Sequence, residues 1–399
     1  MRTYRELFRV PEFLPLFLSS ATMVASGTLR GLALATLVYT ATGSPLLSAL
    51  SLFGSHFAQV IGAMTLLSLA DRVPPRAGMV ALTTVHGLGT LALALPGMPI
   101  WGMFAVIGVL GLLGSVGNGV RWGLLGEILP GGDYLLGRSV FNMSVGVMQI
   151  GGFAIGGVLL TFTSSRRVLV LATVLCLAAA LLNRFGLVGR PPRAAGRVSV
   201  GTTWRVNAWL WSAPGRRFAY LAAWVPNGLV VGNEALFVAY RPDSAAVLFV
   251  CGALGMLVGD TAMGRFVRPE WREGLLTPVQ LLLGVPYLIF ALSPALPLAA
   301  VAVAAASAGF SGSLLLQQRI VDLTPEEMRG QALGLHSAGM FTMQAVGASL
   351  AGLVAEWMPT AGAMVVMGLL SVAVTLSLRP GLRATRSASV DAAPGRRRS

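Results

Sequence analysis

Charged side chains are scarce in this chain of 399 residues, and lysine is absent. Only 11% of the residues are Asp, Glu, Lys or Arg, against roughly a quarter in soluble domains. Apolar residues make up 55%, and the mean hydropathy is +0.75. A soluble globular protein could not cover its surface with so few charges, so most of this chain is expected to face lipid.

Cysteine is also rare, since only Cys176 and Cys251 are present, each inside an apolar run. They form no metal-binding spacing and no disulfide framework, so both are expected to be small core residues. The sequence contains no Ser-His-Asp set, no phosphate-binding glycine loop followed by lysine, and no metal-ligand cluster. We therefore expect neither an enzyme nor a cofactor or metal. Without an ATPase domain, any uphill movement must draw on an ion gradient.

All 29 basic residues are arginine, and the formal net charge is +14. A basic patch can indicate nucleic-acid binding, but these arginines stand between apolar segments instead of forming one face. This distribution is typical of membrane proteins, whose cytoplasmic loops are enriched in basic residues. We therefore expect lipid, and no nucleic acid, around the chain.

Twelve apolar runs come close to the roughly 20 residues that a helix needs to cross a bilayer. The first is too long for the apolar core of a signal peptide and is expected to be a membrane anchor. The runs are 13–40, 45–70, 77–96, 99–122, 137–162, 167–188, 218–240, 244–264, 274–293, 295–318, 330–354 and 360–378.

A hydrophilic segment rich in arginine and proline divides these runs into two sets of six. The sequence predicts an N-terminal bundle over 1–188, a basic linker over 189–217, a C-terminal bundle over 218–378 and a disordered tail over 379–399. If loops alternate between the two sides, 25 of the 29 arginines fall on one side. We therefore expect an even number of spans, with the linker and both termini cytoplasmic.

Within the linker, Trp204, Ala208 and Trp211 have helical spacing. This pattern fits a short helix at the headgroup surface. An irregular loop with interfacial tryptophans is the alternative.

The two halves also resemble each other at an offset of 195 residues. Matching pairs include Glu127 with Asp322, Gln149 with Gln344, Gly152 with Gly347, and Gly157 with Gly352. Because six spans per repeat is an even number, the repeats run parallel, as in transporters of the alternating-access type.

Between the second and third runs the sequence reads Leu-Ala-Asp-Arg-Val-Pro-Pro-Arg over 69–76, with a weaker echo over 264–268. It resembles the loop signature of the major facilitator superfamily, Gly-x-x-x-Asp-Arg-x-x-Arg-Arg, without the leading glycine. The resemblance implies that Asp71, Arg72 and Arg76 clamp the cytoplasmic side when the cavity faces outward. Ordinary positive-inside anchoring is the alternative.

The resemblance extends over nearly the whole chain. It implies an all-α membrane protein with twelve transmembrane helices in two pseudo-symmetric six-helix bundles. The segments 7–9 and 38–45 look like drug-efflux members. The segment 151–157 is similar to an antiporter signature ending in Gly-Pro-x-x-Gly-Gly, although Phe153 replaces the proline. The resemblance implies a gating role for three glycines of this segment, Gly152, Gly156 and Gly157. Close helix packing is the alternative.

Two charges lie well inside predicted spans, Arg30 in the first and Glu234 in the seventh. A charge near the membrane centre costs roughly 2.5–3.5 kcal/mol on insertion scales, so it usually faces a cavity or a partner. These two spans occupy equivalent positions in the repeats, and in the family both line the central cavity. We therefore expect Arg30 and Glu234 to meet, or to share a substrate, across the pseudo-symmetry axis. A purely structural pair is the alternative.

Further polar side chains recur at helical spacing within the spans and are candidates for the substrate or proton pathway. Polar residues that only hold helices together are the alternative. The candidates are Ser26, Asn118, Gln149, Asn227, Asn233 and Gln344.

The function expected from these features is export of a small molecule, with Glu234 carrying the coupling proton. Uptake or facilitated diffusion of an anionic metabolite, bound by Arg30, is an alternative. A non-transporting sensor or scaffold with the same fold is another, although no soluble domain long enough for signalling is present. Arginine-only, Gly- and Ala-rich usage suggests a bacterial source of high GC content, and hence the plasma membrane.

Overall fold

The computed structural model describes residues 4–66, 69–70, 72–129, 133–192, 200–325 and 328–391. Within them, twelve helical spans are long and apolar enough to cross a membrane, as the sequence predicted. The chain is a multi-pass membrane protein. A short helix, α1 (Tyr4–Leu7), precedes the first span.

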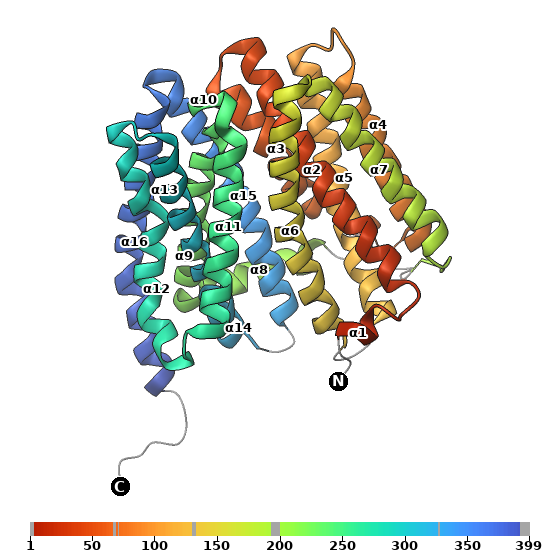
Figure 1. Cartoon of the computed structure of the whole chain (residues 1–399). Helices are drawn as coiled ribbons and strands as arrows, with labels where there is room; N and C mark the ends of the chain where they lie inside the picture. Colours follow the sequence, from red (N-terminus) through yellow and green to blue (C-terminus); the bar gives the residue numbers. More distant parts are fainter. Residues whose placement is uncertain are drawn as a thin grey trace.

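The first six spans form one bundle, and each is a single uninterrupted helix (Figure 1). They are α2 (Phe13–Thr42), α3 (Pro45–Thr65), α4 (Pro75–Ala94), α5 (Ile100–Ile128), α6 (Asp133–Phe162) and α7 (Ser165–Gly186).

Four of the six spans in the second bundle are broken into shorter pieces. These are α9 (Pro214–Ala235) with α10 (Phe237–Tyr240), α11 (Ala245–Thr261) with the π-helical η3 (Ala262–Phe266), α12 (Pro269–Gly284) with the 3₁₀ segment η4 (Val285–Leu292), and α13 (Leu296–Ala308) with η5 (Gly309–Ser311) and α14 (Gly312–Asp322). The last two, α15 (Arg329–Trp357) and α16 (Thr360–Asp391), are continuous. A helix thus occupies 379–391, where the sequence predicted a disordered tail; α16 continues through Pro380, and Arg319 of α14 donates a hydrogen bond to the carbonyl of Leu382 at 2.6 Å.

A proline inside α9 leaves one helix carbonyl without its usual partner. Pro226 lies inside α9 and has no N–H to donate to the carbonyl of Ala222, four residues earlier. The Nε2 of Gln280, on α12, donates to that carbonyl at 2.7 Å instead. The carbonyl that the proline leaves free is therefore satisfied from a neighbouring helix, as membrane burial requires.

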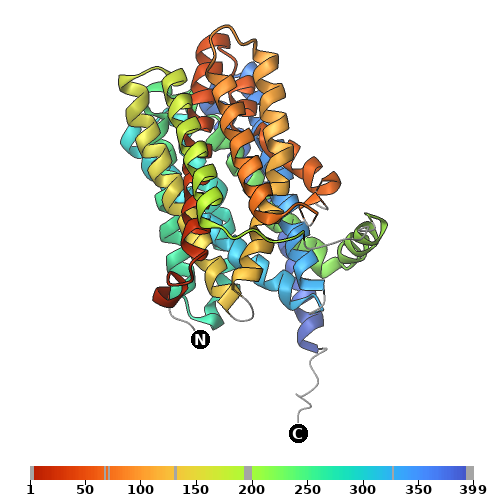
Figure 2. The same cartoon turned by 90° about the vertical axis from the view of Figure 1, so that its right-hand side faces the viewer.

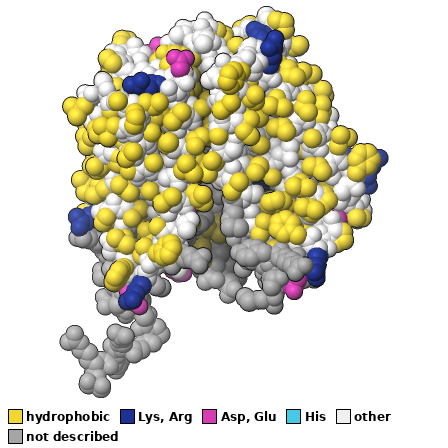
Figure 3. All heavy atoms as spheres, in the orientation of Figure 1, with side chains coloured by type: hydrophobic (Ala, Val, Ile, Leu, Met, Phe, Trp, Pro, Cys, Tyr) yellow, Lys and Arg dark blue, Asp and Glu magenta, His cyan; other side chains and the backbone are white. Residues whose placement is uncertain are grey.

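On the face drawn in Figure 3, apolar side chains cover most of both bundles, and charged side chains lie mainly toward the two ends. Exposed apolar residues include Trp101, Val174, Val258 and Val301. This distribution fits a lipid-facing belt.

The turn between α2 and α3 is specified by three consecutive residues. Gly43 ends α2 in a left-handed conformation (φ 66°), and its N–H donates to the carbonyl of Tyr39. The hydroxyl of Ser44 then accepts the N–H of Leu47, which caps the start of α3, and Pro45 occupies the first turn.

The predicted linker contains a helix, α8 (Val200–Ser212), as its tryptophan spacing suggested. It lies across the bundle axis, at the end of the molecule that carries both termini (Figures 1 and 2). We call this end the terminus end and the opposite one the far end. Arg216, at the start of α9, donates hydrogen bonds to the carbonyls of Trp209, Leu210 and Leu323. These bonds attach α8 to the second bundle.

Candidate site: the interface between the two bundles

The two bundles meet mainly along two helix pairs, α3 with α15 and α6 with α11 (Figure 1). The helices of each pair come from different repeats, α3 and α6 from the first and α11 and α15 from the second. A movement of one bundle against the other must therefore rearrange these two seams.

At the far end, a glycine on each seam brings the bundles into direct contact. A Cβ atom built on Gly157 of α6 would overlap the side chain of Ala246 at the start of α11. A Cβ built on Gly352 of α15 would lie 2.7 Å from the Cα of Leu46 in α3. These two glycines are the pair that the 195-residue offset matched. The pseudo-symmetry of the sequence is thus present in the contact that closes the far end.

A carboxylate adds a polar contact at the same end. Glu356, near the end of α15, accepts hydrogen bonds from the hydroxyl of Ser44 and from the N–H of Leu46, at 3.2 Å in the second case. An acid is favourable here because the first N–H groups of a helix have no partner within the helix. Glu356 therefore caps α3 across the bundle boundary.

Aromatic contacts continue the interface inward. Phe153 of α6 stacks on Phe249 of α11 with ring centroids 4.4 Å apart. His56 of α3 stacks on Phe341 of α15 at 5.2 Å, about halfway along both helices. The hydroxyl of Tyr39 also donates to the carbonyl of Ala239 at 3.3 Å. The closed part of the interface thus extends from the far end to about mid-depth.

The hydrophobic core shows the same asymmetry in the described part of the chain. Two core clusters contain buried residues from both bundles, for example Leu32 with Val231, and Ala49 with Ala348. The clusters toward the terminus end do not cross the boundary: one lies wholly within residues 7–187 and the other within 206–382. Among the described residues, the bundles are therefore packed together at the far end and separate at the terminus end.

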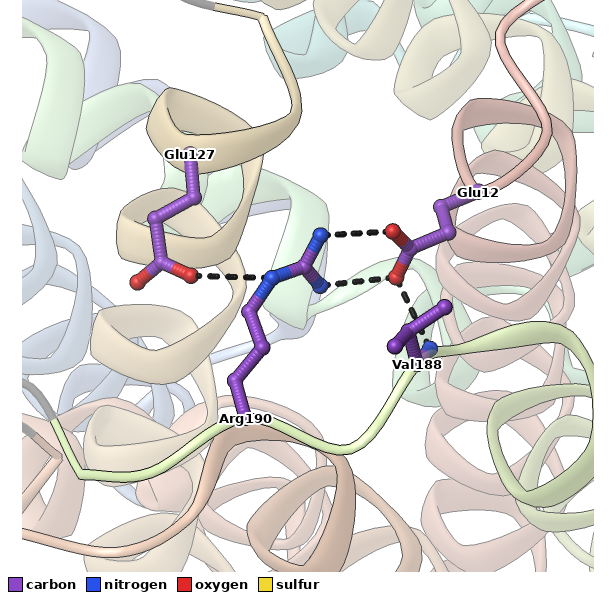
Figure 4. A network of polar contacts seen from close by, with 4 residues as sticks. All are labelled: Glu12, Glu127, Val188 and Arg190. Atoms are coloured by element: carbon purple, nitrogen blue, oxygen red, sulfur yellow. Dashed lines mark hydrogen bonds and ion pairs between the residues drawn. The ribbon is translucent and has the colours of Figure 1, made fainter.

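An ionic network at the terminus end lies within the first bundle and the start of the linker (Figure 4). Arg190 makes a two-pronged contact with Glu12, at 2.7 and 2.6 Å, and its Nε lies 3.5 Å from Glu127 of α5. The N–H of Val188 also donates to Glu12. Burial raises the pKa of the Glu12 carboxyl, but these hydrogen bonds lower it further, so the pKa lies below its ordinary value of 4.5. The network attaches the start of the linker to the first bundle.

The predicted gating residues occupy varied positions. Asp71 lies outside the described residues. The N–H of Arg72 donates to the carbonyl of Leu69, and Arg76 donates to the carbonyl of Arg184 within the same bundle. Among the glycines, a Cβ on Gly152 would meet Thr28, and one on Gly156 would meet Leu29, both on α2. These two positions pack α6 against α2, whereas Gly157 contacts the other bundle.

Arg30 and Glu234 do not form an ion pair in this conformation. The Nη1 of Arg30 donates to the hydroxyl of Thr90 on α4 at 3.3 Å, and Cys176 of α7 is also close enough to interact electrostatically. Glu234 interacts electrostatically with Tyr287 of η4, and no hydrogen bond to its carboxyl is present among the described residues. Each charge therefore faces its own bundle, and the expectation that the two meet is wrong for this state.

The other predicted residues divide into paired and unpaired side chains. The Oδ1 of Asn227 accepts from Gln344 at 3.3 Å, which joins α9 to α15. Asn227 also lines a small pocket in the second bundle, together with Gln280. Asn233 is fully buried, and within the described structure neither of its amide atoms has a partner. Gln149 is half-buried and forms no side-chain hydrogen bond to the described residues.

Two further predicted residues, Ser26 and Asn118, form hydrogen bonds whose partners the sequence did not predict. The hydroxyl of Ser26 donates to the carbonyl of Ala172 at 2.7 Å, so it packs α2 against α7. The Oδ1 of Asn118 accepts from Arg121 at 2.9 Å. Arg121 fell at the end of the predicted span 99–122, but α5 continues to Ile128 and places it about two turns inside the helix.

No protein-family model matches the chain, and no curated protein resembles it in sequence. Solved structures do resemble it in fold. A POT family transporter in complex with a thioalcohol-conjugated peptide superposes with a TM-score of 0.75 at 12% identity, over 92% of this chain and 95% of that one. The fold is that of the major facilitator superfamily.

Two further structures support the assignment of this fold. A point mutant of the nucleoside transporter NupG gives a TM-score of 0.72 at 13% identity, over 92% of this chain and 99% of that one. A bacterial homolog of the human lysosomal transporter Spinster, in an inward-facing and unoccupied conformation, gives 0.66 at 15% identity, over 96% of each chain. At such identities the likeness establishes the major facilitator fold and not the substrate.

Proposed function

We propose that the protein is a secondary active transporter that moves a small molecule across the plasma membrane by alternating access. The observation that carries the proposal is the one-ended contact between the bundles: they meet at Gly157 and Gly352, and the described core residues at the terminus end do not cross between them. Two pseudo-symmetric bundles that rock about a central site can expose that site to each side in turn.

The orientation follows from the arginines. Because basic loops favour the cytoplasm, we place both termini, α8 and the separated end of the interface on the cytoplasmic side. The loop with Asp71, Arg72 and Arg76 then lies at the cytoplasmic entrance, where it would clamp the bundles once the far end opens. Labelling of an exposed far-end cysteine, such as Asp243→Cys, by an impermeant maleimide in intact cells tests this orientation. Labelling confined to inverted vesicles would reverse it.

Proton-coupled export is the direction and coupling that we favour. Glu234 is a half-buried carboxyl without a hydrogen bond among the described residues, so it can exchange a proton when the site changes sides. In inside-out vesicles, substrate addition should drive proton efflux, and Glu234→Gln should abolish it. Asp260→Asn, a second acid within a span of the same bundle, is the matched control. Unaltered proton flux in Glu234→Gln would remove the coupling role.

Uptake of an anionic metabolite is the second candidate. Arg30 is hydrogen-bonded to a neutral hydroxyl and has no acidic partner among the described residues, so it could bind a substrate carboxylate. Among the structural neighbours, a POT family transporter is bound to 5-aminolevulinic acid and a peptide transporter to sulfate. Accumulation of labelled organic anions by intact expressing cells would favour uptake, and reduced accumulation would favour export.

A further inference from the structure

Trp122, on the cytoplasmic third of α5, lies beside two guanidinium groups. The Cζ of Arg121 is 4.6 Å from the centroid of its ring, and the Cζ of Arg138, on α6, is 5.2 Å away. Asn118 accepts a hydrogen bond from Arg121 and so helps to fix its orientation. We call Arg121, Trp122 and Arg138 the Trp122 cradle.

No carboxylate among the described residues balances the positive charge of this cradle. Neither arginine forms an ion pair with any described residue, and the Nε of Arg121 is buried without a hydrogen-bond partner among them. Glu127, the one acid in α5, contacts Arg190 instead. Arg121 lies seven residues from the end of α5, about 10 Å at 1.5 Å per residue. A charge at such depth usually has a partner or a functional role.

The chemistry of the cradle selects the ligand. Guanidinium groups bind carboxylates and other oxyanions through paired hydrogen bonds, and stacking on an aromatic ring holds them in a fixed geometry. All three side chains are half-buried, so part of each remains accessible in the conformation that is separated at the terminus end. An organic anion could therefore reach both arginines.

We propose that the Trp122 cradle is a binding site for the carboxylate of a small organic anion. This proposal rests on the proposed transport function only in taking the bound anion to be the transported substrate. Binding can be measured without transport, so the two proposals can fail separately. Interfacial anchoring of an arginine–tryptophan cluster is the competing explanation.

The test uses the full chain, purified in detergent without added lipid, with benzoate as the probe and benzamide as its uncharged isostere. Benzoate should raise the melting temperature in a concentration-dependent way, because a ligand that binds only the folded state stabilises it. Benzamide should not. Arg121→Gln and Arg138→Gln should each weaken benzoate binding by about tenfold or more.

The chain offers a matched control. Arg268 lies over Trp271 at 5.7 Å at the same end of the second bundle, and no second arginine of the described side chains lies over that ring. Arg268→Gln should leave benzoate binding unchanged, and Arg121→Lys, which keeps the charge, should retain part of it. Equal responses to benzoate and benzamide, equal losses in Arg121→Gln and Arg268→Gln, or a response that requires anionic lipid would each overturn the proposal. Transport of benzoate is measured in a separate experiment with proteoliposomes, so that a failure of transport can be distinguished from a failure of binding.

Discussion

The two ends of the bundle interface are held by different kinds of contact. At the far end, Gly157 and Gly352 let backbones of different bundles touch, and Glu356 reaches across the boundary. At the terminus end, Arg190 and Arg216 each bind groups of their own bundle. The far-end contacts must break for the bundles to rock, whereas the terminus-end contacts can persist while each bundle moves as a unit. The contrast separates residues that control access from residues that stabilise one bundle.

The largest effect is expected at Gly157. Gly157→Leu would place a side chain where the backbone meets Ala246, and overpacking of this kind costs about 1–3 kcal/mol. Because the cost falls only on the far-end-closed state, that state should lose about 10- to 100-fold in population, and transport should fall accordingly. Gly151→Leu, on the same helix but with open space around it, is the control. Equal losses of transport in both variants would contradict a role in closure.

Arg216 provides the next largest effect, on stability. Arg216→Met removes three hydrogen bonds to carbonyls and the contact with the ring of Trp209 at 4.1 Å. We expect a loss of about 2–3 kcal/mol, measured by thermal unfolding, with the access equilibrium unchanged. Arg217→Met should have little effect. If Arg216→Met changed the access equilibrium without lowering the stability, the proposed difference between the two ends would be wrong.

Glu12 supplies a pH-dependent prediction. Its pKa is lowered in the folded protein from an ordinary value of 4.5, so its contribution is complete above that value and is lost as the pH falls through the folded pKa. Glu12→Gln should cost about 1–2 kcal/mol at pH 7. The difference in melting temperature between this variant and the parent should shrink as the pH falls below 4.5 and vanish once the pH lies below the folded pKa of Glu12. A difference that persists under acid would show that the charge is not the cause.

The smallest effect is expected at Glu356. Because this carboxylate is exposed, Glu356→Ala should shift the population away from the far-end-closed state by only about two- to fivefold. Access of an impermeant thiol reagent to a far-end cysteine reports this shift. Glu270→Gln, an exposed acid at the other end, is the control. An unchanged rate of labelling would mean that the cap does not influence closure.

The sequence was sufficient for the helices and their symmetry, because hydropathy and loop arginines report on lipid directly. The offset that paired Gly157 with Gly352 also identified equivalent contacts. Helical spacing showed which residues share a face, but not which helix that face meets. For example, the sequence did not show that Ser26 contacts α7 or that Arg30 contacts α4. The predicted span ended at 122, whereas α5 continues to Ile128, so the sequence did not show how deep in the helix Arg121 lies.

Distances between spin labels at both ends test the rocking of the bundles most directly. In a cysteine-free background, one pair at Thr40 and Asp243 reports the far end, and one at Thr65 and Ser337 reports the terminus end; all four positions are exposed. Introducing Gly157→Leu should lengthen the far-end distance and shorten the terminus-end distance in the same sample. Two distances that stay fixed, or that change in the same direction, would contradict alternating access through this interface.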